Sequence, residues 1–479
     1  MLAESSSLDR LALVEFGAIT PNVDFPVHIF PEEKPMNQPK SKRALPGLLI
    51  AASAFVSGCG GGGGGNGFSG AGFAPVATTP APVKIQVTGP NPVSQWNEVA
   101  IDTINQPAAT TGTAAEQRPS DAVDLAAVHL AIYNALAAIT GKYQLYGITV
   151  PVEVGADASQ PAAVAAAARG VLNGLFPNRS GQYQDAYVRA LASIEEGSAK
   201  SQGVEVGNVM ARAILTLRAD DGRSVVLAPY VPGTAPGRFR GVNPVNRFGP
   251  YIKPYALESA SQFRTPPPPA LDSEPYAADF NETRLLGGAV GSTRTSEQLE
   301  IARFHTEPPN RFWPRNLRRF AMTDGALVDQ ARLMAMLFAI EADAGIACFE
   351  SKYHYETWRP QSAIPLADTD GNPATVPDTA WKPIVPTPNH PEYPAAHACV
   401  SAAVAETLKT YYRTEQVEFS FDSTVTGTTH AFASTKALVD EVRGARIYGG
   451  MHFRNSLVRG EELGINVAQW TLARNFQAR

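Results

Sequence analysis

The sequence predicts an all-α fold of helical bundles joined by long irregular loops. Apolar residues recur at three- and four-residue steps in many segments, most clearly in residues 121–139, and Ser120 can cap that segment. Alternating strand patterns are scarce, and two stretches rich in proline and glycine separate the periodic segments. Helix following helix with irregular links and little strand is typical of bundle architectures.

The periodic segments define the expected helices. They cover residues 96–104, 121–139, 162–175, 182–199, 200–218, 276–286, 296–304, 324–351, 397–412 and 434–446. The irregular stretches are residues 220–275 and 365–391. Loops of this length in a compact domain usually shape a pocket or carry function.

Size and composition exclude some classes of protein. The 479 residues can bury the core of one large domain or two ordinary ones. A net charge of −5 with 18% charged residues argues against a nucleic-acid binder, which would show a basic surplus. Three cysteines are too few for a disulfide framework. We interpret Cys348 and Cys399 as small buried apolar residues rather than as a bridge.

The N-terminal region resembles a bacterial lipoprotein signal. Basic residues lie within 40–43, an apolar run covers 44–56, and Cys59 follows with six glycines after it. The apolar run is too short to span a bilayer as a mature helix. The resemblance implies lipidation of Cys59 in an exported protein, anchored to the bacterial membrane on the periplasmic side or at the cell surface. The alternative is a cytosolic protein with a disordered apolar tail.

These features suggest a division of the chain. Met36 stands where a signal peptide would begin, so residues 1–35 are interpreted as a non-native extension. Residues 36–59 form the signal, and residues 60–92 a disordered tether by composition. Residues 93–479 form the helical domain, and we expect membrane association only through the lipid.

Three segments near the C-terminus carry the candidate chemistry: residues 352–360, 392–399 and 445–452. Together they contribute three fixed cations and two imidazoles, namely Lys352, Arg359, Arg446, His397 and His452. A tetrahedral oxyanion can be gripped by such cations and attacked by such a nitrogen. An oxyanion site, for phosphate or vanadate, is therefore the leading hypothesis.

Spacing predicts how these residues are presented. Lys352 and Arg359 are seven residues apart, so a continuous helix would place both on one face until Pro360 ends or bends it. His354, between them, is interpreted as a packing residue. His397 opens a helix of small residues, whose N-terminus attracts anions, and can act as a general acid or base.

The third segment combines a cation with a second imidazole. Arg446 lies six residues before His452, and Gly449 and Gly450 stand between them. These glycines are expected to break the helix and turn the histidine back towards the site. Each of the five residues also has a plain structural explanation, such as a solvated helix face, a cap or a surface ion pair. Their combination favours the site.

The order and spacings resemble the vanadium-dependent haloperoxidases and the type 2 phosphatidic acid phosphatase superfamily that includes them. That pattern is Lys, six residues, Arg-Pro; then Pro-Ser-Gly-His; then Ser-Arg, five residues, His, three residues, Asp. The matching positions are Lys352, Arg359, Pro360, Pro394, His397, Arg446 and His452. The resemblance extends from about Trp96 to the C-terminus, favours the bacterial haloperoxidase-like branch, and implies helical bundles of the haloperoxidase/acid phosphatase type.

The resemblance also implies roles. Vanadate would be the cofactor, bound to His452, with Lys352, Arg359, Arg446 and the N–H of Ala396 around its oxygens, and phosphate can occupy the same place. His397 would accept a proton from hydrogen peroxide, Lys352 would polarise the peroxide, and halide would be oxidised. His390 would line the halide side, by analogy alone.

Four positions depart from the pattern. Ala395 and Ala396 replace Ser-Gly, Ala445 replaces the serine before the arginine, and Ser456 replaces the final aspartate. One lost hydrogen bond to a charged oxyanion costs roughly 1.5–3 kcal/mol, which weakens a site without abolishing it. Because that aspartate orients the attacking histidine in the phosphatases, its loss puts phosphohistidine chemistry in doubt.

Three functions therefore stay open from the sequence. The first is halide oxidation with hydrogen peroxide. The second is an acid phosphatase that acts on phosphate esters through a phosphohistidine at the same site. The third is a catalytically degenerate, anion-binding surface lipoprotein. The sequence indicates neither the halide, nor the organic acceptor, nor the oligomeric state.

Overall fold

The computed structural model describes residues 81–148, 154–155 and 157–479, and these fold mainly into α-helices. The predictions for Cys59, for the signal and for residues 1–35 lie outside the described residues. The all-α prediction is confirmed, with a small three-stranded sheet added. The predicted helix at residues 296–304 is observed at those bounds as α8 (Ser296–Phe304).

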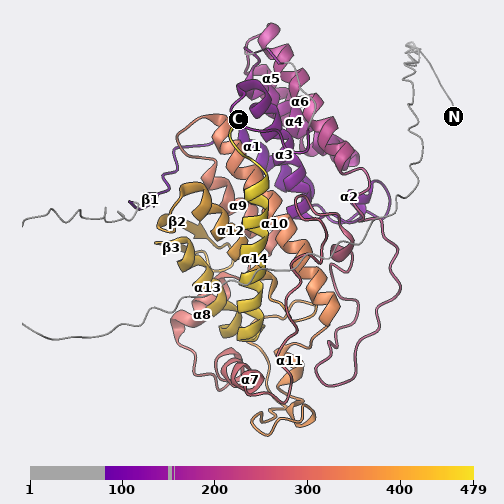
Figure 1. Ribbon diagram of the computed structural model, residues 1–479, viewed down its shortest axis with the longest axis vertical. Coiled ribbons are helices and arrows are strands. Elements are labelled where there is room, and N and C mark those ends of the chain that lie inside the picture. Colours follow the sequence, from indigo (N-terminus) through magenta and orange to yellow (C-terminus); the bar gives the residue numbers. More distant parts are fainter. Residues whose placement is uncertain (1–80, 149–153, 156) are drawn as a thin grey trace, which may run out of the picture. The chain divides into compact units, whose positions relative to one another are not determined.

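The first group of helices surrounds α3 (Asp121–Thr140). It contains α1 (Pro92–Ile104), α4 (Gln160–Leu175), α5 (Gln184–Ala192) and α6 (Ser198–Leu217), drawn in indigo to magenta in Figure 1. Helix α3 is long and apolar enough to cross a membrane by length and composition, but 89% of its apolar window is buried inside the fold. It is the core helix of this group.

Small residues allow α4 and α6 to pack closely. A side chain at Gly203 or Gly207 of α6 would overlap backbone atoms of Ser159 or of Ala163. The alanine-rich face of α4 meets these glycines, so the two helices approach each other at backbone distance.

The second group is built on α10 (Leu327–Tyr355), α12 (Ala396–Tyr412) and α14 (Arg454–Arg474). Figure 1 shows α14 running beside α12 and α10. A glycine again allows two segments to approach closely, here α14 and the residues that lead into α12. A Cβ at Gly460 of α14 would lie 2.8 Å from the carbonyl oxygen of Ala395. The start of α12 is thereby held against α14.

Further elements frame this second group. Helix α13 (Thr435–Tyr448) packs on α12 and α8, and α7 (Glu274–Gly287) contacts α13 and α14. The short helices α2 (Ala114–Gln117) and α11 (Pro360–Ala363) lie in the connections. The stretches 220–275 and 365–391 are largely irregular, as predicted, with only short helical turns.

Several elements were not predicted. Helix α9 (Pro309–Leu317), helix α14 and the hairpin of β2 (Val417–Asp422) with β3 (Thr429–Phe432) were missed. The segment 182–199 is not one helix, because α5 ends at Ala192 and α6 begins only at Ser198. Strand β2 alternates buried and half-buried residues, which is a strand signal in retrospect. Strand β1 (Val83–Lys84) pairs in parallel with β2, so that part of the predicted tether is ordered.

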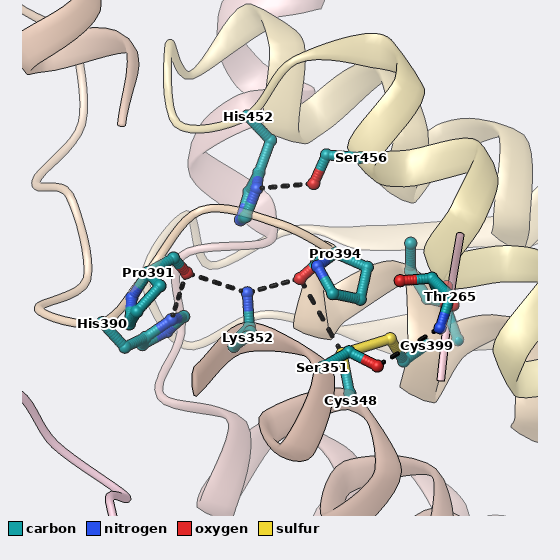
Figure 2. The surroundings of a disulfide bond; sticks show 12 residues. Thr265, Cys348, Ser351, Lys352, His390, Pro391, Pro394, Cys399, His452 and Ser456 are labelled. Atoms are coloured by element: carbon teal, nitrogen blue, oxygen red, sulfur yellow. Dashed lines mark hydrogen bonds between the residues drawn. A yellow bond between two sulfur atoms is a disulfide. The ribbon is translucent and has the colours of Figure 1, made fainter. Parts of the chain in front are cut away.

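The expectation that Cys348 and Cys399 form no bridge was wrong. Cys348 of α10 and Cys399 of α12 are both fully buried, as expected, but they form a disulfide with their Cα atoms 6.4 Å apart (Figure 2). They are 51 residues apart in the sequence, and only the packing of α10 on α12 brings them together. The bridge therefore fixes one helix of the candidate site to the other.

Replacing both cysteines by alanine should lower the free energy of unfolding by about 2–4 kcal/mol, because the bridge constrains the unfolded chain. Urea titration monitored by circular dichroism measures the change. Each single variant should lose nearly as much as the double variant, since either one breaks the bridge. Single effects that sum to the double effect would show that the bridge is absent.

Candidate active site

The first candidate segment folds differently from the prediction of a continuous helix. Helix α10 ends at Tyr355, and Glu356 takes a left-handed conformation with φ 49°. Arg359 lies beyond this turn as the N-cap of α11, and Pro360 begins that helix rather than ending α10. His354 is exposed and does not pack in the core. Lys352 and Arg359 nevertheless converge, because the chain reverses between them.

Lys352 is fully buried and ties down the segment that precedes α12. Its Nζ donates hydrogen bonds to the carbonyl oxygens of Pro391 (3.1 Å) and Pro394, both drawn in Figure 2, and to that of Glu392 (3.0 Å). Burial, and then the charge of Arg359, lower the pKa of Lys352 well below its ordinary value. All three ammonium protons point at carbonyls, so Lys352 contributes charge and an anchor rather than a free donor.

Arg359 connects the first and third segments. Its Nη1 lies 2.9 Å from the carbonyl oxygen of Met451 and 2.9 Å from Nε2 of His452, and its Nε lies 2.9 Å from the carbonyl oxygen of His390. Burial lowers the pKa of Arg359 to about 10, opposed by the negative charge of Glu392. The guanidinium therefore remains charged at neutral pH beside the imidazole of His452.

The imidazole of His452 is held by a carboxylate that sequence analysis missed. Nδ1 of His452 lies 2.8 Å from Oε1 of Glu392, while the Ser456 hydroxyl is 3.4 Å away. Because a carboxylate only accepts, Nδ1 carries the proton and Nε2 keeps its lone pair. The tautomer is inferred from these partners. Glu392 thus stands where the absent aspartate was expected to act.

Glu392 is itself fixed by backbone and charge. Its Oε1 also accepts from the N–H of Phe453 at 3.0 Å, and the residue is only 3% exposed. Burial raises the pKa of Glu392 to about 7, opposed by the charges of Arg359 and Lys352. The residue opens the second candidate segment, but nothing in its sequence position shows that it reaches His452.

Arg446 of α13 lies at the end of the cavity described below. Its Nη1 donates to the carbonyl oxygen of His305 at 3.0 Å, and its Nη2 lies 2.9 Å from Sδ of Met451. Its Nε is buried and has no hydrogen-bond partner among the described residues. Burial, and then Arg359, lower the pKa of Arg446 to about 9. The guanidinium thus keeps an unused donor.

His397 lies in the first turn of α12 and is half-buried. No hydrogen bond from the described part of the chain reaches its ring nitrogens. Burial, and then Arg446, lower the pKa of His397 well below its ordinary value, so the ring is a neutral proton acceptor near pH 7. The backbone N–H groups of Ala396 and His397 have no acceptor in the described regions, which leaves the positive end of α12 available.

A cavity of about 390 Å³ reaches part of this region, whereas Lys352, Arg359 and His452 lie behind its lining. Its inner end is lined by His397, Arg446 and His390, and the face of α10 forms a wall. Nδ1 of His390 lies 3.0 Å from Nη2 of Arg359. The imidazole ring of His390 packs edge-on against the ring of Phe349, with their centroids 5.2 Å apart. The structure therefore brings all the predicted side chains to one region, with His390 at its edge.

The charges define which ligand can bind. Arg359 and Lys352 lie close enough to Glu392 to lower the pKa of its carboxyl group, Arg446 adds a third basic group, and the imidazoles of His397 and His452 have lowered pKa values. In the described residues, no cluster of three or more His, Cys, Asp or Glu side chains is arranged to hold a metal ion. The excess of positive charge, the Nε of Arg446 and the start of α12 fit an oxyanion.

Two sequence comparisons show which known proteins this chain is similar to. Residues 332–478 match the family described as the VCPO second helical-bundle domain. The vanadium chloroperoxidase of Curvularia inaequalis is 24% identical over 403 residues, covering 66% of this chain and 65% of that protein, just under two thirds of its length. The resemblance to the vanadium haloperoxidases is confirmed.

Solved haloperoxidase structures share the fold. A structure described as the first bacterial vanadium-dependent iodoperoxidase superposes with a TM-score of 0.63 at 20% identity, covering 82% of this chain and 99% of that one. A holo-type bacterial vanadium-dependent chloroperoxidase gives a TM-score of 0.62 at 15% identity, covering 81% and 97%. At this identity the likeness establishes the helical architecture.

Arg446→Lys should weaken the binding of inorganic phosphate about tenfold or more, because the lysine keeps the charge but loses the planar set of donors. Isothermal titration calorimetry measures the affinity. Arg443→Lys is the matched control, since Arg443 lies one turn earlier on α13 and pairs with Glu461. Equal affinities for all three proteins would contradict the assignment of Arg446.

Proposed function

We propose that the protein is a vanadate-dependent haloperoxidase that oxidises halide with hydrogen peroxide. The observation that carries the proposal is the imidazole of His452, whose Nδ1 is fixed by Glu392 and whose Nε2 faces Arg359. In a metal-ligating histidine, one ring nitrogen usually binds the metal while the other donates a hydrogen bond to a carboxylate or a similar acceptor. The relationship to the vanadium haloperoxidases supports the proposal.

The residues present fit vanadate. Nε2 of His452 accepts from Nη1 of Arg359 and would exchange this hydrogen bond for vanadate, while Arg446 offers its unpartnered Nε and Ala396 its N–H. Arg359 and Lys352 neutralise the charge, and Lys352 does so through its field because its protons are bound to carbonyls. When bound, vanadate supplies a Lewis acid that activates hydrogen peroxide towards halide.

Side chains of the protein would transfer the protons that halide oxidation requires. Halide and hydrogen peroxide, with one proton, give hypohalous acid and water. His397 is neutral, lies in the cavity and can take the proton of incoming hydrogen peroxide, then return it to the departing water. His390 and Phe349 present a ring edge and a ring face beside Arg359, where we place the halide.

We also propose that the protein is exported and held at the membrane through Cys59. The buried disulfide between Cys348 and Cys399 supports export, because such bridges persist in oxidising compartments.

A phosphatase at the same site is the second candidate. The hydrogen bond between Glu392 and His452 favours it, because the histidine has the orienting carboxylate that the sequence seemed to lack. His452 would attack phosphorus, the arginines would stabilise the transferring phosphoryl group, and His397 would protonate the leaving alcohol.

Purified protein loaded with orthovanadate should oxidise bromide or iodide when hydrogen peroxide is added. Triiodide absorbance, or bromination of a phenol dye, measures the rate. His452→Ala and Lys352→Ala should lose the activity by at least a hundredfold, since they remove the ligand and the anchor. Vanadate-inhibited hydrolysis of p-nitrophenyl phosphate, without halide oxidation, would support the phosphatase instead. Neither activity in a folded protein would leave a non-catalytic anion-binding protein.

Glu392→Gln separates the ligand bond of His452 from the electrostatics of the site. Vanadate affinity should fall about 10–100-fold, because a ligating histidine loses its carboxylate partner. Affinity for inorganic phosphate should not fall, since a negative charge has been removed beside an anion. Calorimetric titrations with each anion measure both. Ser456→Ala is the control, and a similar loss there, or equal losses of both anions in Glu392→Gln, would contradict this role.

A further inference from the structure

Two carboxyl groups line the cavity away from Arg446 and have no basic partner among the described residues. Asp121 is the first residue of α3, and Glu341 lies in the middle of α10; both line the cavity. Glu341 is 3% exposed, and its Oε2 has no hydrogen-bond partner among the described residues. A buried carboxyl group without a partner is unfavourable, so this end of the cavity lacks a ligand group that would satisfy it.

No cation of the described chain pairs with these two carboxyl groups. The nearby Arg223 is already bound to Asp124 at 2.8 Å and to Asp221 at 2.8 Å. Burial, and then Asp124, raise the pKa of Asp121 to about 6. Burial, and then the charge of Asp121, raise the pKa of Glu341 well above its ordinary value. Burial thus favours the neutral form of both carboxyl groups, and a cation bound beside them would favour their ionised form. We call this part of the cavity its acidic end, and the part lined by Arg446 its cationic end.

The wall between the two ends is apolar and open. Glu341, Gly345 and Phe349 follow one another at four-residue steps on α10, so they share one face of the helix. A Cβ at Gly345 would meet no atom within 4 Å. Phe248, Trp313 and Ile346 add apolar surface. From Glu341 to Phe349, which both line the cavity, the helix rises about 12 Å, which is room for an organic molecule.

We infer that this cavity binds an organic amine, with its ammonium group at Asp121 and Glu341 and its apolar body along α10 towards His397. The inference rests on the proposed function, in which the molecule would be the halogen acceptor. In an amine with an aromatic body, a ring carbon would form the bond to halogen as the oxygen–halogen bond of hypohalous acid breaks. The proton released from that carbon and the hydroxide released from the acid would give water.

A metal ion is the alternative occupant, and the geometry disfavours it. Hard divalent cations require six or more oxygen ligands, whereas two carboxyl groups converge here and the described residues offer no third acidic or imidazole ligand. The aromatic residues Phe248, Trp313 and Phe349 suit an organic cation, whose charge their ring faces stabilise.

Calorimetry on the full chain with two matched probes tests the inference. Tryptamine carries the ammonium group, and 3-ethylindole is its neutral counterpart. At pH 7.5 tryptamine should bind at least tenfold more tightly than 3-ethylindole. Its affinity should fall as the pH drops through about 6, the pKa of Asp121, because the protonated carboxyl group no longer attracts a cation. Equal affinities of the two probes would overturn the inference without any variant.

Variants locate the site. Glu341→Gln and Asp121→Asn should each reduce the preference for tryptamine to below threefold while leaving 3-ethylindole binding unchanged. Glu350→Gln is the control on the same helix, because Glu350 pairs with Arg264 outside the cavity, and it should keep the full preference. Gly345→Leu should abolish binding of both probes, since its side chain fills the wall, and should leave phosphate affinity unchanged.

Other outcomes would refute the site. A preference that survives in Glu341→Gln would show that the carboxyl pair does not hold the amine. Circular dichroism and phosphate titration confirm that each variant is folded. The proposed oxidation is measured separately, with halide and no amine. Oxidation without the tryptamine preference defeats this inference alone, and the preference without oxidation defeats the proposed function alone.

Discussion

The ammonium group of Lys352 holds the candidate site together. Its hydrogen bonds to the carbonyls of Pro391, Glu392 and Pro394 fix the short segment that leads into α12. That segment supplies the Glu392 carboxylate to His452 and sets where His397 begins its helix. The disulfide between Cys348 and Cys399 makes the same connection between α10 and α12 by a covalent route. Without this connection, the cations, the carboxylate and the two imidazoles would lie on independent elements.

The orienting carboxylate shows how one function can move to another position. The family pattern places an acidic residue four positions after the attacking histidine, one helical turn away, and this chain has Ser456 there. Glu392 reaches the same nitrogen from a different segment, 60 residues earlier. The physical requirement is an acceptor at Nδ1 that leaves a lone pair on Nε2, and the requirement does not specify where in the chain the acceptor comes from.

The helices and the three segments could be predicted because their signals are local. The period of α3, the small residues at the start of α12 and the glycines after Tyr448 act within a few residues of each other. The ion pairs, the disulfide and the role of Glu392 depend on which elements pack together, which no local pattern shows. The end of α10 was also missed, because Glu356 takes a left-handed conformation that glycine or asparagine would usually mark.

The two ends of the cavity are linked by the rigidity of α10. Glu341 and Phe349 lie on one uninterrupted helix and Phe349 contacts His390, so the helical rise sets the distance from the carboxyl pair to that imidazole. Lys352 lies in the last turn of α10, where the helix dipole favours positive charge. Gly345 is the position along this wall at which a side chain would meet open space. The length of this wall is therefore fixed by the fold, whereas the space beside it depends in part on the residue at position 345.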